Sequence, residues 1–193
     1  MDKNRLEAFS DGVIAIIITI MVLEIKVPHA DTWAELSPLL LLLFSYALSF
    51  VYVGIYWNNH HHMLQATQHV TGGILWANLH LLFWLSLLPF ATNWMGEHHF
   101  ASMPLAAYGF VLLMAAIAYF ILQNTIIASQ GENSLLAKAV GRDTKGKISP
   151  VLYLLAMIAA FYKPMLSEAI YVLVALMWLV PDKRIERLLQ HKT

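Results

Sequence analysis

The sequence has no cysteine and few charged residues. None of its 193 residues is cysteine, and only 12% are Asp, Glu, Lys or Arg. The lack of cysteine excludes disulfides and cysteine-ligated metal or iron–sulfur sites. Soluble domains carry about 25% charged residues, whereas 59% of this chain is apolar. The composition therefore predicts an all-α protein that crosses a membrane several times.

The sequence also lacks the short motifs of the common enzymes. It contains no Gly-x-Ser-x-Gly, no His-Glu-x-x-His and no glycine-rich phosphate loop. The potassium-filter sequence Thr-Val-Gly-Tyr-Gly is absent as well. Because its 12 basic and 12 acidic residues balance, the charge indicates no nucleic-acid partner. We expect no enzyme activity and no cofactor.

Six apolar segments have or approach the length of about 20 residues that a membrane-spanning helix needs. Pro89 is expected to kink the third segment, and Pro150 is expected to begin the fifth. The fifth segment is short, and we expect it to form a tight pair with the sixth. Together the segments predict a single transmembrane domain over residues 1–193. They are residues 6–27, 37–62, 71–94, 104–128, 149–162 and 165–181.

Basic residues set the expected orientation, because positively charged loops stay in the cytoplasm. With the N-terminus inside, Lys26 and Lys163 are the outside members of the 12 basic residues. This asymmetry predicts an even number of spans with both termini cytoplasmic. The ten inside are Lys3, Arg5, Lys138, Arg142, Lys145, Lys147, Lys183, Arg184, Arg187 and Lys192.

The first segment combines a polar start with an apolar continuation. Residues 5–12 carry Ser10 and Asp11, and residues 13–23 are apolar except for Thr19. A carboxylate at the mouth of a spanning helix is costly unless it is paired or hydrated, so the fold must supply a partner for Asp11. A signal peptide is the alternative interpretation, but Glu7 places acid in its basic region and no small-x-small cleavage site follows Leu23.

The second and third segments carry further polar side chains. Trp57 and His61 are four residues apart, so they share one side of a helix, and their N–H groups can serve a buried carboxylate or hydroxyl. Asn78 and His80 lie within the third apolar run and need partners there. A structural network and a proton relay both fit these residues. A metal site is disfavoured, because the consecutive residues His60, His61 and His62 point in different directions on a helix.

Arg5-x-x-x-Phe9-Ser10-Asp11-Gly12 resembles the signature of the transmembrane protein 175 family, the endosomal and lysosomal potassium channels of animals and their bacterial relatives. Trp57-x-x-His60-His61 and the third segment, with Asn78 and residues 87–90, are similar to that family too. Animal members carry two such units in one chain. This single unit resembles a bacterial member, which implies a multi-pass protein of the bacterial cell membrane.

The resemblance implies a homotetramer whose first helices line a central pore. It implies conduction of monovalent cations with a modest preference for potassium over sodium. In this sequence the family's apolar constriction corresponds to Ile16, with Ile20 and Leu23 one and two turns above, and the hydroxyl that contributes to selectivity corresponds to Thr19. The signature network then comprises Arg5, Phe9, Ser10, Asp11, Trp57, His60, His61 and Asn78.

Two other functions remain open at this point. Nine histidines and the polar groups inside the apolar segments are compatible with a proton-coupled transporter or a proton leak pathway. A membrane scaffold without conduction is also compatible with the composition.

Overall fold

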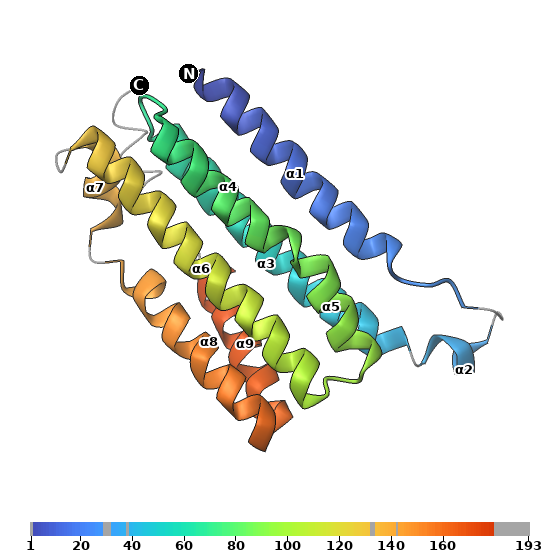
Figure 1. Ribbon diagram of the computed structural model, residues 1–193. Coiled ribbons are helices and arrows are strands. Elements are labelled where there is room, and N and C mark those ends of the chain that lie inside the picture. Colours follow the sequence, from blue (N-terminus) through green and yellow to red (C-terminus); the bar gives the residue numbers. More distant parts are fainter. Residues whose placement is uncertain (1, 29–31, 38, 132–133, 142, 180–193) are drawn as a thin grey trace.

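Figure 1 shows the computed structural model of the protein, which describes residues 2–28, 32–37, 39–131, 134–141 and 143–179. The described residues form helices and no strands. The helices are α1 (Lys3–Leu23), α2 (Trp33–Leu36), α3 (Leu39–Gln65), α4 (Gly72–Ser86), α5 (Leu88–Glu97), α6 (Ser102–Gln130), α7 (Leu135–Val140), α8 (Thr144–Tyr162) and α9 (Pro164–Leu179).

The six predicted segments all correspond to helices. The third is divided into α4 and α5 at Leu87, just before Pro89, which agrees with the predicted kink. Within the described part of the chain, α1, α3, the α4–α5 pair, α6 and α8 are long and apolar enough to cross a membrane. Helix α9 has 16 described residues, so a sixth crossing stays a prediction. The short helices α2 and α7 were not predicted.

The predicted start of the fifth segment was wrong. Helix α8 begins at Thr144, and Pro150 lies inside it. Its start is set by Asp143, whose side chain accepts a hydrogen bond from the Gly146 amide at 3.0 Å and so satisfies one free amide of the first turn. Pro150 has no N–H and therefore leaves the Gly146 carbonyl without its helical partner.

The long helices form one bundle with α1 on its edge (Figure 1). Helix α1 packs against α3, α4 and α5, and α6 packs against α4 on one side and α8 on the other. Helices α8 and α9 form the predicted tight pair, joined at Lys163. Trp178 near the end of α9 donates to Ser149 in α8 at 2.8 Å, so α9 runs back along α8 towards the start of that helix. Of the basic residues used for orientation, Arg142, Lys183, Arg184, Arg187 and Lys192 lie outside the described residues.

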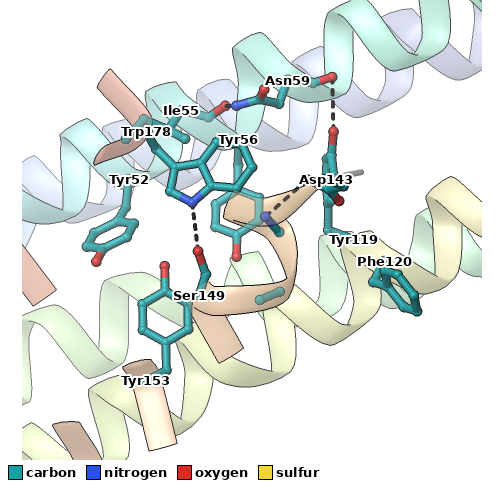
Figure 2. A pocket seen from close by; sticks show the side chains of 12 residues that line it. Tyr52, Ile55, Tyr56, Asn59, Tyr119, Phe120, Asp143, Ser149, Tyr153 and Trp178 are labelled. Atoms are coloured by element: carbon teal, nitrogen blue, oxygen red, sulfur yellow. Dashed lines mark hydrogen bonds between the residues drawn. The ribbon is translucent and has the colours of Figure 1, made fainter. Parts of the chain in front are cut away.

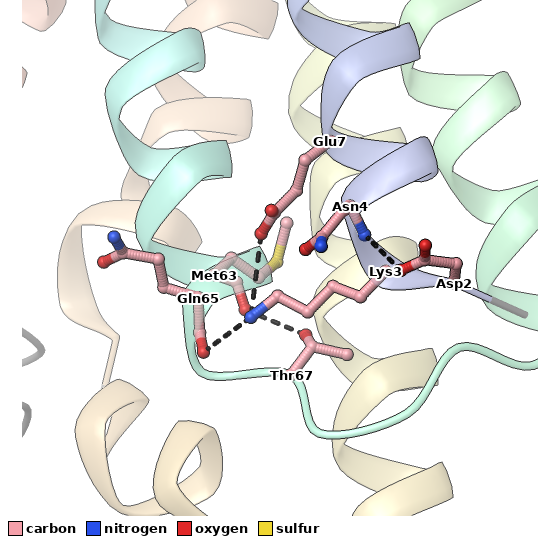
Figure 3. Close-up of polar contacts among 7 residues, drawn as sticks. All are labelled: Asp2, Lys3, Asn4, Glu7, Met63, Gln65 and Thr67. Carbon is pink, nitrogen blue, oxygen red and sulfur yellow. Dashed lines mark hydrogen bonds and ion pairs between the residues drawn. The ribbon is translucent and has the colours of Figure 1, made fainter.

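The start of α1 is attached to the end of α3 (Figure 3). The Lys3 ammonium donates to the Gln65 carbonyl at 3.1 Å and pairs with the Glu7 carboxylate at 3.6 Å. The last carbonyls of a helix have no helical partner and carry partial negative charge, so a cation there is favourable. Lys3 therefore links two helices and neutralises an acid of the signature segment.

A chain of buried hydroxyls crosses the middle of the bundle. Thr92 of α5 donates to Ser49 of α3 at 2.7 Å, and Ser49 donates to the Tyr108 hydroxyl of α6 at 3.1 Å. The Tyr171 hydroxyl of α9 in turn donates to the Leu105 carbonyl at 3.1 Å. The hydrophobic effect contributes little to helix association in lipid, so hydrogen bonds between helices contribute to it instead. These hydrogen bonds hold together the helices against which α1 packs.

Gly96 of α5 lies tightly against α3, and we expect Gly96→Ala to destabilise the bundle. An added Cβ would lie 2.5 Å from Ser45 Oγ, 2.7 Å from Leu42 Cδ1 and 3.0 Å from the Leu42 Cα. Because the last of these is backbone, the helices must separate, at a cost of about 1–3 kcal/mol. Gly54→Ala in α3 is the control, since its Cβ would meet nothing within 4 Å. Equal free energies of unfolding of the two variants in detergent would contradict the expectation.

Candidate functional site

Helix α1 buries one side of its surface and exposes the other. The buried residues follow the helical repeat and are Leu6, Ser10, Ile14, Ile17 and Met21. Outside this buried side lie Ile16, Ile20 and Leu23, with 57%, 41% and 79% of their surface exposed, and the exposed Thr19. The four predicted pore residues therefore share the side of α1 that the rest of the chain leaves uncovered.

The Thr19 hydroxyl donates to the Ile16 carbonyl of its own helix at 2.9 Å. A hydroxyl has one hydrogen to donate and two lone pairs that accept. Because the hydrogen is used inside the helix, the oxygen presents lone pairs on the exposed side of α1. A ring of such oxygens can take the place of water around a cation.

The signature residues hold α1 to the bundle through two separate contacts. On one flank the Trp57 indole of α3 donates to the Asp11 carboxylate at 3.0 Å, and His61 stacks on the Trp57 ring, with ring centroids 5.9 Å apart. On the buried side the Asn78 amide of α4 donates to Ser10 Oγ at 3.0 Å. The partner that Asp11 required is therefore an indole N–H.

Three helices meet at a buried polar chain that begins at His60, which is 1% exposed. Its Nε2 lies 2.7 Å from Asn78 Oδ1, so the ring donates to an amide oxygen. Asn78 donates to Ser10, and Ser10 donates to the Leu6 carbonyl at 2.8 Å. No side-chain nitrogen or oxygen of His60, Asn78 or Ser10 is buried without a hydrogen-bond partner, which is what a buried network needs in order to stabilise.

Some expected contacts differ in the structure. The expected hydrogen bond from His61 to the signature carboxylate or hydroxyl is replaced by its stacking on Trp57, and His60 is the histidine that turns inward.

Among the described residues, neither Asp11 nor Glu7 forms an ion pair with Arg5, which is exposed. His80 accepts a hydrogen bond from Trp84 of its own helix at 2.9 Å. Phe9 is exposed on the same side of α1 as Ile16.

The polar groups near the far end of α1 were not predicted. Ile20 and Glu24 border a hollow of about 440 Å³ together with Asn93 and Glu97 of α5. Glu97 pairs with Lys26 at 3.5 Å. The only signal in the sequence was the polar Glu24-Ile25-Lys26 that ends the first apolar run, and it carries no information about α5.

The long apolar helices are those of a multi-pass membrane protein, and α1 leaves an apolar, hydroxyl-bearing side uncovered. Comparison with known proteins specifies the family. The family model of the endosomal/lysosomal potassium channel TMEM175 matches residues 5–89, and the chain belongs to that family, as predicted from the Arg5–Gly12 motif.

Similarity to individual relatives covers nearly the whole chain. A potassium channel of a Chryseobacterium species (strain P1-3) is 58% identical over 190 residues, covering 98% of this chain and 99% of the relative. A potassium channel of Chamaesiphon minutus is 33% identical over 91% of this chain and 92% of its own length. The crystal structure of a lysosomal potassium-selective channel TMEM175 homolog from that organism matches with a TM-score of 0.80 at 28% identity, over 93% of this chain and 97% of the other. This is a family of multi-pass membrane channels and not of enzymes.

Proposed function

We propose that this protein is a potassium channel that conducts through a central pore of a homotetramer, with α1 of each subunit lining the pore. The proposal rests on the uncovered side of α1, along which Ile16, Thr19 and Leu23 lie at successive turns of the helix. The names and the solved structure of the relatives support potassium as the permeant ion. One unit of residues 1–193 per subunit, six spans, cytoplasmic termini and a bacterial cell membrane complete the proposal.

Apolar side chains can gate such a pore without a charged barrier. Four Ile16 side chains around an axis form a ring that expels water when it is narrow and admits a partly hydrated cation when it widens. Ile20 and Leu23 add apolar rings beyond it. Potassium holds its water less tightly than sodium, so a constriction that removes some water favours potassium. In this proposal the channel needs no cofactor and only the permeant ions as ligands.

The signature network has a positioning role in this proposal. Trp57 binds Asp11 on one flank of α1, and Asn78 binds Ser10 on its buried side. These contacts fix the rotation of α1 about its axis and so decide which residues face the pore. Lys3 fixes its start in the same way.

Ion flux from liposomes tests the proposal. Purified protein is reconstituted into vesicles loaded with potassium, and a proton-sensitive dye reports proton uptake after a protonophore is added, with sodium-loaded vesicles in parallel. We expect potassium vesicles to respond faster than sodium vesicles. Vesicles with folded protein that respond to neither cation would contradict a channel.

The buried His60 makes a proton pathway the second candidate, and the same assay separates it. The chain from His60 through Asn78 and Ser10 ends on the Leu6 carbonyl, an oxygen that does not take up and release protons at ordinary pH. This ending favours an anchor over a proton relay. A dye response in potassium vesicles that contain a potassium ionophore but no protonophore would instead favour the proton pathway.

Thr19→Ala is expected to weaken the preference for potassium while conduction survives. The substitution removes the four lone-pair-bearing oxygens but leaves the apolar rings. We expect the potassium-to-sodium permeability ratio, measured from reversal potentials, to fall by about threefold or more, which corresponds to about 0.7 kcal/mol. Thr125→Ala is the control, because the Thr125 hydroxyl also donates to a carbonyl of its own helix, and that helix is α6 and not α1. An unchanged ratio in Thr19→Ala would remove Thr19 from the selective region.

A further inference from the structure

A second cavity lies away from α1, between α3, α6, α8 and α9 (Figure 2). It has a volume of about 40 Å³, which is room for more than one water molecule. No residue of the proposed pore lines it. The lining residues are Tyr52, Ile55, Tyr56, Asn59, Ala116, Tyr119, Phe120, Asp143, Gly146, Ser149, Tyr153 and Trp178.

The walls of this cavity are mainly aromatic rings. Four tyrosines, one phenylalanine and one tryptophan line it, from all four helices. The negative faces of such rings attract cations, and several rings around one space form the known type of cage for ammonium groups. The structure contains an ammonium near this cage, because Lys145 Nζ lies 6.0 Å from the centre of the Trp178 ring.

Polar groups are placed at specific points of the aromatic wall. Figure 2 shows the hydroxyls of Tyr56, Ser149 and Tyr153 pointing into the same part of the cavity. Ser149 Oγ accepts from the Trp178 indole at 2.8 Å and donates to the Lys145 carbonyl at 2.8 Å, which leaves one lone pair for a ligand. Hydroxyl oxygens that converge in this way can accept hydrogen bonds from one ligand group that has several hydrogens to donate.

A carboxylate completes the set. Asp143 lines the cavity, and its described contacts are with neutral donors, namely the Gly146 amide at 3.0 Å and the Gln123 amide at 3.5 Å. Its backbone is left-handed, with φ of 36°, which a capping Asp or Asn tolerates best. A negative group beside aromatic rings selects a cation over a neutral molecule of the same shape.

We propose that this cavity binds the ammonium head of a short primary alkylamine. The ammonium donates to the Asp143 carboxylate and to the converging hydroxyls, and the alkyl tail lies along the tyrosine rings. An ammonium has three hydrogens to donate, which suits several acceptors better than a quaternary ammonium does. The site is separate from the conduction path, so it holds whether or not α1 forms the pore.

The test uses n-propylammonium and its neutral counterpart propan-1-ol on the purified full chain in a neutral detergent. Ligand-observed saturation-transfer NMR, titrated at constant ionic strength, gives the dissociation constant of each. We expect propylammonium to bind at least about tenfold more tightly than propan-1-ol, because charge-assisted hydrogen bonds are the strong ones. Equal affinities would overturn the proposal and leave a merely apolar cavity.

Asp143→Asn identifies the site of binding. Asparagine keeps the oxygen that caps α8 and tolerates the left-handed backbone, so the fold should be retained while the charge is lost. We expect propylammonium affinity to fall about tenfold, with propan-1-ol unchanged. Asp2→Asn is the matched control, since Asp2 caps α1 in the same way, through the Asn4 amide, and lines no part of the cavity.

Tyr56→Leu provides an independent variant. It removes one ring and one of the converging hydroxyls without touching the capping group, and we expect it to weaken propylammonium binding as well. Binding that stays at the wild-type level in both Asp143→Asn and Tyr56→Leu would place the amine elsewhere and overturn the proposal.

Discussion

Ile16→Asn is expected to raise the resting cation conductance of the channel by at least tenfold. A ring of four isoleucines repels water, whereas a ring of four asparagine amides binds it. The variant therefore removes the free-energy barrier that a constriction without water presents to a permeating ion. A tenfold increase corresponds to a barrier lower by about 1.4 kcal/mol. The measurement is the single-channel open probability and the macroscopic current in planar bilayers. Because Ile16 is 57% exposed in the subunit, the folding of the subunit should be little affected.

The control for Ile16→Asn is Ile158→Asn. Ile158 is also an exposed isoleucine, with 52% of its surface accessible, but it belongs to α8, which packs against α6 and α9. The same chemical change there should leave the conductance near the wild-type value. If the two variants leak equally, the constriction lies elsewhere and asparagine acts only by loosening the assembly.

The sequence predicted the positions of the long helices because spanning helices are long apolar runs between polar breaks. It could not decide which side of α1 is buried, since nearly all residues from 13 to 23 are apolar. The structure resolves this through neighbours on α3, α4 and α5, which bury Ile14, Ile17 and Met21. In lipid both sides of such a helix are compatible with the surroundings, so only tertiary contacts distinguish them.

The signature network was predictable in part. The Asp11 carboxylate and the Trp57 indole were expected at the same depth in the membrane, on two different helices. This suggested a contact between them, which the structure contains. The choice between neighbouring histidines depended on the rotation of α3, which the sequence leaves open. His60 faces inward and His61 stacks on Trp57.

The start of α8 could have been predicted from Asp143-Thr144, which is a capping pair. Pro150 is compatible with a helix start but does not require one, since its cost inside the helix is one lost hydrogen bond. The aromatic cavity, in contrast, could not be predicted. Its tyrosines come from α3, α6 and α8, and no local pattern brings them together.

Asn78→Leu is expected to cause the largest loss of stability, about 3 kcal/mol. Asn78 is fully buried and joins His60 to Ser10, so its removal leaves the imidazole N–H without an acceptor and the hydroxyl without a donor. Each buried polar group left unsatisfied costs about 1–3 kcal/mol. Leucine has a similar size, so the loss reflects hydrogen bonding more than a cavity. The measurement is the free energy of unfolding from denaturant titration in detergent micelles.

Asn124→Leu provides the matched comparison for Asn78→Leu. Asn124 of α6 is exposed, and its amide donates to the Phe120 carbonyl of its own helix at 2.8 Å, so the same substitution should change stability by no more than about 0.5 kcal/mol. The double variant Ser10→Ala with Asn78→Leu should lose less than the sum of the two single losses, because both residues belong to one network. Strict additivity, or an equal loss in Asn124→Leu, would mean that the buried polar chain does not hold α1 in place.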